Sequence, residues 1–265
     1  MNYLKDTKDQ TIFHFQNGYI EVTANGWELK PYTTEMPEGA IDGNFGFRSY
    51  IHMKDAGVFG DFVWKIANQD HERFLSLCSI IGYINHDFHD CDLKAINLTD
   101  SPQNKSGRSG KTLFTNMLSY VRKVVSMNGK DFDAKDKFNY QSINRDTQIV
   151  ILDDIITKGR NKFNFDDLLS NISEEITVKK LYEKPFRKFV KWSVISPSPI
   201  NTHTASQQER IISFELSDYF GINNSPLDEY GLWFGRDFNE DEWNRYYNFM
   251  CYCSSLFHRR GIITA

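Results

Sequence analysis

The first 32 residues alternate between apolar and polar positions in short runs. Runs at residues 11–16, 19–24 and 27–32 are rich in β-branched and aromatic side chains, and the dipeptides Asn17-Gly18 and Asn25-Gly26 separate them. Such dipeptides favour tight hairpin turns because both residues accept positive φ. The pattern predicts a small β meander, followed by a connecting segment up to residue 57 with little regular structure.

In the rest of the chain, apolar residues recur with the periods of helices and strands. The spacing of apolar residues over 60–86 predicts one or two amphipathic helices. Residues 94–99 (KAINLT) and the apolar run 149–152 (IVIL) predict strands, and residues 113–125 (LFTNMLSYVRKVV) between them predict a helix. The later pattern predicts a short helix over 163–169, two β-prone segments over 176–191, and strands over 191–197 and 208–216.

The C-terminal segment has one long helical pattern. Asn239 and Glu242 have the spacing of a capping box, and aromatic residues continue with helical spacing towards Gly261. We expect this aromatic stripe to be buried. The expected organisation is a β meander with its connecting segment (1–57), a helical segment (58–90), an α/β core (91–222) and a C-terminal helical segment (223–265).

Residues 104–112 (NKSGRSGKT) lie between the predicted strand 94–99 and the predicted helix. In such a loop, backbone N–H groups approach phosphate oxygens, Lys111 adds positive charge for the β and γ phosphates, and the Thr112 hydroxyl can ligate Mg²⁺. The nucleotide-binding candidates are Ser106, Gly107, Arg108, Ser109, Gly110, Lys111 and Thr112. The strict pattern has a glycine where this chain has Lys105, so a lysine-rich surface turn is the alternative interpretation.

Asp153 and Asp154 follow the apolar run 149–152. The end of a strand in a parallel sheet would place them beside a nucleotide held by the preceding loop. We expect Asp153 to hold Mg²⁺ together with Thr112, and Asp154 to orient the attacking water. Together with Lys111 they are catalytic candidates.

The segment 176–191 concentrates positive charge in a chain of formal net charge −4. Its charged residues after Glu175 are Lys179, Lys180, Glu183, Lys184, Arg187, Lys188 and Lys191. Local positive charge in an acidic chain fits an element that follows a phosphate backbone. A solvated strand face is the alternative.

Composition narrows the class of protein. With 265 residues, 40% hydrophobic and 15% aromatic, the chain can bury the core of one α/β domain with appendages. No apolar run approaches the length of a membrane span and the N-terminus lacks a signal-peptide core, so we expect a soluble, cytoplasmic protein without membrane contact.

The cysteines lack paired C-x-x-C spacing, so we expect reduced side chains in the core; they are Cys78, Cys91, Cys251 and Cys253. A polar helix end explains the group His86, His89 and Cys91, and no metal is assigned there.

The order of these motifs resembles the superfamily 3 helicases, specifically the helicase part of primase-helicase proteins of phages, plasmids and other mobile elements. SGRSGKT occupies the place of the family's phosphate loop, IVILDD that of the acidic strand end, and NISEEITVKKLYEKPF that of the basic DNA-contacting hairpin. WSVISPSPINT and SQQERIISFELSDYF occupy the places of the sensor strand and the following arginine segment. The resemblance implies an α/β, AAA+-like P-loop NTPase fold with a central, mostly parallel sheet.

The resemblance also implies ATP and Mg²⁺ as cofactors and an ATP-driven DNA helicase or translocase. Such a motor acts as a ring, a hexamer by resemblance, on single-stranded or forked DNA. Lys179, Lys180 and Lys184 would contact DNA, while Tyr182 or Phe186 would either stack on bases or pack in the core. Related motors belong to longer replication proteins, so a primase or polymerase domain is an expected partner.

Two positions depart from the family pattern. The sensor strand ends near Pro197 and not in asparagine, which leaves Ser196 or Ser198 as the polar contact to the nucleotide. A common arginine pair is replaced by Glu209-Arg210, so Arg210 alone would stabilise the γ-phosphate of a neighbouring subunit's site. A nucleotide-controlled DNA- or protein-binding assembly with weak or no turnover is therefore the alternative function. A small-molecule kinase would explain the phosphate loop but neither the acidic pair nor the basic segment.

Overall fold

The computed structural model describes residues 4–32, 48–89, 93–104, 107–133, 136, 138–156 and 163–264. The chain divides into two compact units. Unit 1 comprises Met1–Phe88, Leu113–Arg122 and Tyr219–Ala265, and unit 2 comprises His89–Thr112 and Lys123–Asp218. No helix in the described part of the chain is long and apolar enough to cross a bilayer.

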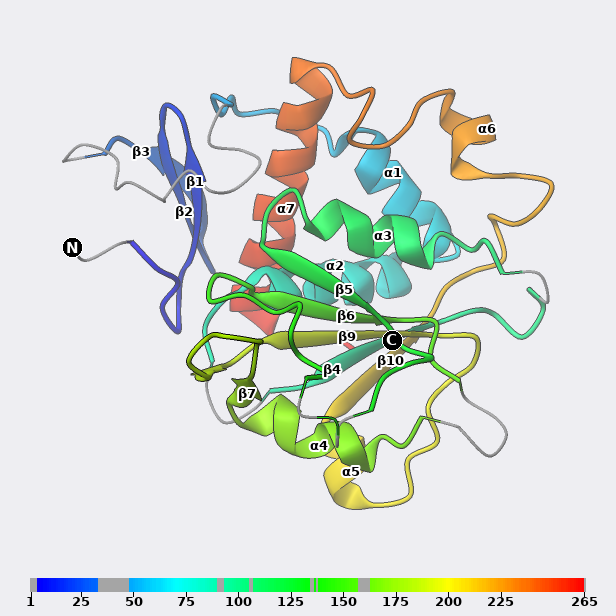
Figure 1. Ribbon diagram of the computed structural model, residues 1–265. Coiled ribbons are helices and arrows are strands. Elements are labelled where there is room, and N and C mark those ends of the chain that lie inside the picture. Colours follow the sequence, from blue (N-terminus) through cyan, green and yellow to red (C-terminus); the bar gives the residue numbers. More distant parts are fainter. Residues whose placement is uncertain are drawn as a thin grey trace. The chain divides into compact units, whose positions relative to one another are not determined.

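Unit 2 is built on a five-stranded parallel sheet. Its strands are β4 (Ala95–Thr99), β5 (Val124–Asn128), β6 (Ile149–Asp153), β9 (Lys191–Ser196) and β10 (Ile211–Glu215), in the order β10-β4-β9-β6-β5 (Figure 1). Every residue of β4 and β9 is buried, as expected for central strands of a parallel sheet. The predicted α/β fold with a central parallel sheet is confirmed.

The remaining elements of unit 2 are short. Helices α4 (Asp166–Ser173) and α5 (Ala205–Glu209) flank the strands, and β7 (Ile176–Val178) pairs antiparallel with β8 (Phe186–Lys188) (Figure 1). Trp192 of β9 is buried among apolar side chains that include Leu168 and Ile172 of α4, and its indole nitrogen donates to the carbonyl of Asn171 at 2.9 Å. The core therefore lies between α4 and the sheet.

The predicted helix over 113–125 is too long. Helix α3 (Lys111–Leu118) ends early, and Val124 and Val125 begin strand β5, which pairs with β6. β-branched residues lose side-chain freedom in helices but pack well on a sheet, so pairing with β6 is favoured over two more helical turns. The helix predicted over 163–169 is displaced to α4, whose first turn carries Asp166 and Asp167. The strand predicted over 208–216 is shorter, because α5 extends over its first two residues and β10 begins at Ile211.

Unit 1 contains the predicted meander and helices. Strands β1 (Thr11–Phe15), β2 (Gly18–Thr23) and β3 (Gly26–Lys30) form an antiparallel sheet. The helices are α1 (Gly57–Ile66), α2 (His71–Asn85), α6 (Pro226–Tyr230) and α7 (Glu240–Arg260). Helix α2 packs directly on α7, and a Cβ at Gly82 would lie 2.2 Å from the carbonyl oxygen of Cys253. Glycine is therefore required for this close helix contact.

Helix α7 begins as the sequence predicts but without the reciprocal bond of a capping box. The side chain of Asn239 accepts from the backbone N–H of Glu242 at 2.8 Å. The Glu242 carboxylate instead accepts from the backbone N–H of Val58 at 2.6 Å, close to the start of α1. Asn239 thus caps α7, and Glu242 satisfies a backbone donor at the start of α1.

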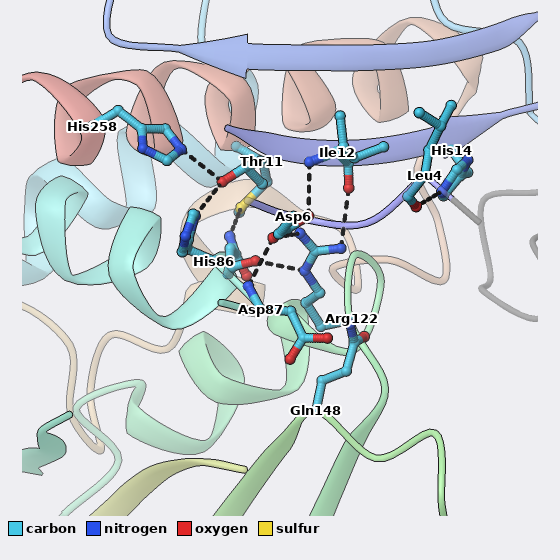
Figure 2. Close-up of polar contacts among 12 residues, drawn as sticks. Leu4, Asp6, Thr11, Ile12, His14, His86, Asp87, Arg122, Gln148 and His258 are labelled. Carbon is cyan, nitrogen blue, oxygen red and sulfur yellow. Dashed lines mark hydrogen bonds and ion pairs between the residues drawn. The ribbon is translucent and has the colours of Figure 1, made fainter. Parts of the chain in front are cut away.

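Arg122 is the centre of a buried polar network in unit 1 (Figure 2). Its guanidinium donates to Asp6 at 2.9 Å and to the carbonyls of Asn85 and Ile12 at 2.6 and 3.2 Å. Asp6 also accepts from the backbone N–H groups of Ile12 and Asp87 at 2.8 and 2.7 Å. The network joins the segment before β1 to the end of α2.

The cysteines of the described residues are reduced and buried. Cys78 of α2 and Cys251 and Cys253 of α7 have free thiols, while Cys91 lies outside the described residues. His86 is buried at the end of α2 and bonds to Thr11, and His89 stacks on Phe189 at a ring distance of 5.3 Å.

Candidate active site

The two predicted motifs lie at the same edge of the unit 2 sheet. The glycine-rich loop follows the carboxyl end of β4 and leads into α3 at Lys111, and Asp153 is the last residue of β6. Because the strands run parallel, with only β9 between β4 and β6, both carboxyl ends meet at one edge. This edge is where ligands of open α/β sheets bind.

The loop backbone turns sharply before the helix. Gly107, Arg108 and Gly110 have φ of 68°, 64° and 96°, in the left-handed region. Glycine adopts this region without steric cost, whereas Arg108 does so under strain. Such turns direct successive N–H groups into a concave anion-binding surface, and the start of α3 adds its positive dipole end. Ser106 lies outside the described residues.

Lys111 is held by a carboxylate that the sequence motifs did not include. Its ammonium donates to Oδ1 of Asp100, the residue after β4, and the Ser109 hydroxyl donates to the same oxygen at 2.6 Å. The side chains of Lys111 and Asp100 are 11% and 9% exposed. The phosphate-loop lysine thus forms a nearly buried ion pair.

The acidic pair has two different environments. Burial, and secondly the charge of Asp154, raises the pKa of Asp153, and the ammonium groups of Lys111 and Lys130 oppose this rise. Asp154 is exposed, has φ of 61° and pairs with Lys130, which follows β5. The ammonium of Lys111 thus favours the charged form of Asp153, and both residues lie at the carboxyl end of the strands.

The donor set at this edge fits a divalent cation. Carboxylate and hydroxyl oxygens are the ligands that Mg²⁺ takes in nucleotide sites, and Asp153 and Thr112, an exposed residue, could supply them. A cation beside Asp153 would also offset the burial and repulsion that raise its pKa.

The sensor candidate Ser196 is fully engaged inside the sheet. It is 1% exposed, its hydroxyl lies 2.8 Å from the side-chain amide of Asn97 on β4, and it donates to the carbonyl of Ser198 at 2.8 Å. Turning the Asn97 amide so that its nitrogen faces Ser196 satisfies both groups. Ser198, in contrast, lines a cavity of about 380 Å³ together with Ile155 and His203.

Arg210 lies at the amino end of the strands of the same sheet, opposite the end that the phosphate loop follows. Its carbonyl accepts from the N–H of Ala95, the first residue of β4, and its side chain bonds to Ser206 and, at 2.6 Å, to Ser173. Since the phosphate loop follows the last residue of β4, five residues at about 3.3 Å each separate the two ends by roughly 16 Å. Arg210 therefore does not lie beside Lys111 of its own chain.

The basic segment forms the β7–β8 hairpin with an exposed tip. Tyr182 and Leu181 at the tip are 103% and 64% exposed, so core packing, one of the two possibilities for Tyr182, is wrong. Phe186 packs against the core, and the guanidinium carbon of Arg145 lies 4.5 Å from the centre of its ring. The side chain of Lys180 donates to Asn144, on the loop before β6.

The other lysines of the segment are not equivalent. Lys184 is exposed and Lys179 is half-buried on either side of the tip. Lys188 donates to the carbonyl of Arg145 at 2.5 Å. Lys191 is 4% exposed as the first residue of β9 and does not contribute to a basic surface, because the segment returns to the sheet at that point.

Comparison with known proteins gives likeness in structure and not in sequence. No protein-family model matches the chain, and no curated protein matches it. The apo structure of the NrS-1 C-terminal region (305–718) is similar with a TM-score of 0.50 and 13% identity, over 97% of this chain and 68% of that chain. The A form of that region has a TM-score of 0.49 and 12% identity over 94% and 66% of the two chains. A JCV helicase has a TM-score of 0.45 and 12% identity over 61% and 45%.

This chain thus spans about two thirds of the length of the NrS-1 region. At 13% identity the likeness shows a shared fold. The likeness agrees with the α/β fold of unit 2.

Sequence reasoning missed Asp100 and Lys130. Both stand where a strand ends at the site edge, after β4 and β5 respectively. The argument that selected Asp153 applies equally to Asp100, a charged residue directly after a buried strand. Lys130 could not be found in this way because β5 was not predicted as a strand, and its first two residues were included in the predicted helix 113–125.

Proposed function

We propose that this chain is the ATP-hydrolysing motor of a DNA helicase or translocase of the superfamily 3 type. The observation that carries the proposal is the meeting of Lys111 and Asp153 at the carboxyl edge of one parallel sheet, after a loop with left-handed turns. A surface turn before an ordinary helix gives no reason for the first lysine of that helix and a partly buried carboxylate to share the carboxyl end of one sheet. The kinase interpretation explains neither Asp154 nor the hairpin.

In this proposal each side chain has a defined task. The loop N–H groups and the Lys111 ammonium bind the β and γ phosphates, and Thr112 and Asp153 hold Mg²⁺. When bound, Mg²⁺ neutralises charge that develops on the phosphates. Asp154 orients the attacking water, and release from Lys130 would free its carboxylate for that contact.

DNA contact is assigned to the hairpin. Its tip offers the exposed ring of Tyr182 between Lys180 and Lys184. A cationic element with an exposed aromatic ring suits single-stranded DNA because phosphates and bases are contacted together. Motion of this hairpin on hydrolysis would move the strand through a ring of subunits.

The first experiment measures ATP hydrolysis by the full chain with and without single-stranded DNA. We expect DNA-stimulated turnover that falls by about a hundredfold or more in Lys111→Ala and in Asp153→Asn, because each removes charge stabilisation of the phosphates. Lys123→Ala is the matched control and should keep full turnover. It changes a lysine directly before β5, at the amino end of the strands and away from the site. Equal hydrolysis in all four proteins would reject the assignment.

The engagement of Arg210 and Ser196 favours a second candidate function. Both side chains already have partners within unit 2, as expected for a nucleotide-controlled DNA- or protein-binding assembly with little turnover. Tight ATP binding that requires Lys111 but is followed by no DNA-stimulated hydrolysis would support this candidate over the motor.

A further inference from the structure

The carboxylate of Asp100 stands outside the motifs that define the site. Its Oδ1 accepts hydrogen bonds from both the Ser109 hydroxyl and the Lys111 ammonium. Ser109 is 1% exposed, and the ion pair itself is nearly buried. Electrostatic attraction is much stronger in such surroundings than at a surface, where water screens it.

This contact competes with the task assigned to Lys111. A phosphate oxygen that approaches the ammonium also approaches the negative charge of Asp100. Two anions close together in a poorly screened site repel each other. Phosphate can therefore bind Lys111 fully only when the ammonium leaves Asp100.

We propose that Asp100 is a positioning residue that holds Lys111 in the nucleotide-free protein and is displaced from it by nucleotide phosphate. The inference rests on the proposed nucleotide-binding function. Lys111 exchanges one anionic partner for another, so its buried charge is compensated in both states. Ser109 keeps a hydrogen bond to Asp100 when the lysine moves. Asp100 thus weakens the binding of phosphate-bearing nucleotides and favours their release.

Asp100→Asn tests the displacement, because it keeps the shape and an acceptor oxygen while removing the charge. We expect ATP and ADP to bind about tenfold more tightly to the variant, since phosphate no longer displaces a charged partner. Adenosine has no phosphate and should bind both proteins equally. Dissociation constants would be measured by competition against a fluorescent ATP analogue.

The matched control is Asp146→Asn. Asp146 is exposed and lies three residues before β6, at the edge opposite the phosphate loop. This variant removes the same charge, so unchanged affinities for ATP and adenosine would assign the effect to the position of Asp100 and not to net charge.

Thermal unfolding supplies a second measurement. Without nucleotide, Asp100→Asn leaves the Lys111 ammonium without its carboxylate and should melt below wild type. Saturating ATP should raise its melting temperature more than that of wild type. If this variant does not fold, Ser109→Ala tests the same displacement with the opposite sign. It removes the hydrogen bond that Asp100 keeps when the lysine moves, so ATP should bind more weakly than to wild type while adenosine binds equally.

The outcomes separate this inference from the function on which it rests. Equal ATP affinity in wild type and Asp100→Asn, with binding lost in Lys111→Ala, would overturn the displacement and leave nucleotide binding intact. Parallel changes for ATP and adenosine would give Asp100 a purely structural role and overturn it as well. Absence of ATP binding in wild type and Asp100→Asn alike would overturn both.

Discussion

The hydroxyl of Thr11 lies between two imidazole rings in unit 1. Its Oγ1 is 2.9 Å from Nδ1 of His86 and 2.9 Å from Nε2 of His258 (Figure 2). One hydroxyl proton can serve one ring while the oxygen accepts from the other, which suits two neutral imidazoles. The rings are 4.7 Å apart, so two positive charges would repel. Burial lowers the pKa of His258, and the charge of Asp9 opposes this more weakly.

This geometry predicts a loss of stability in mild acid. Since the pKa of His258 is lower in the folded state, the unfolded chain binds more protons below about pH 6.5. The free energy of unfolding should therefore fall as the pH decreases from about 6.5 towards the folded pKa, and His14, whose pKa burial also lowers, acts in the same direction. We expect His258→Gln, which hydrogen-bonds but does not titrate, to lose less stability than wild type between about pH 7.5 and 5.5. Urea denaturation at both pH values measures this, and equal losses would contradict it.

Single residues were predictable where a motif fixes their spacing. The loop glycines and Lys111 have the spacing of a phosphate loop, and Asp153 follows an apolar strand, so their place at one end of the sheet could be predicted. Asp100 acts through its neighbours, Ser109 and Lys111, and no spacing rule marks such a contact. The burial of Ser196 and the tip position of Tyr182 likewise depend on how strands pair, which composition alone does not determine.

At the scale of elements, turn residues and strongly periodic runs were reliable. The Asn-Gly turns placed the meander strands within about two residues at each end. Strand β5 was missed because its partner β6 lies 20 residues further along the chain, and pairing with it overrides the local helical pattern. Helix α5 was missed because its capping box, Thr204 with Gln207, precedes only five helical residues.

The proposed role of the β7–β8 hairpin in DNA binding can be tested. Lys179→Ala combined with Lys180→Ala should weaken binding of single-stranded DNA and reduce its salt dependence. Each lost phosphate contact lowers the slope of log affinity against log salt by about 0.7, because fewer counterions are released. Fluorescence anisotropy with a labelled oligonucleotide over a range of salt concentrations measures both quantities.

Two further variants separate hairpin charge from other effects. Tyr182→Ala removes an exposed ring without charge and should weaken binding by about 1–3 kcal/mol at an unchanged salt slope. Lys8→Ala with Lys54→Ala removes the same charge from exposed positions of unit 1. If this control flattened the slope as much as the hairpin variant, net charge and not the hairpin would set DNA affinity.

At the scale of the whole molecule, the chain passes between the two units several times. Unit 1 collects three separate segments, among them Leu113–Arg122 from the middle of the chain. Tyr246 of α7 reaches this segment through its hydroxyl, which bonds to the carbonyl of Met117, and Arg122 binds Asp6 near the N-terminus. Contacts over such separations leave no periodic trace, so sequence patterns could identify elements without showing which of them share a core.

The placement of Arg210 leads to a prediction about assembly. Because Arg210 lies at the sheet edge opposite Lys111, it can stabilise a γ-phosphate only in the site of another subunit. Lys111→Ala and Arg210→Ala should each abolish ATP hydrolysis, while an equal mixture should regain turnover. A site is intact where an Arg210→Ala subunit supplies the lysine and its Lys111→Ala neighbour supplies the arginine, about one interface in four for random head-to-tail mixing. Activity would be measured against total protein concentration, with each variant alone as control. If Arg210 acted within its own chain, or only supported the fold through Ser173, mixing would restore nothing.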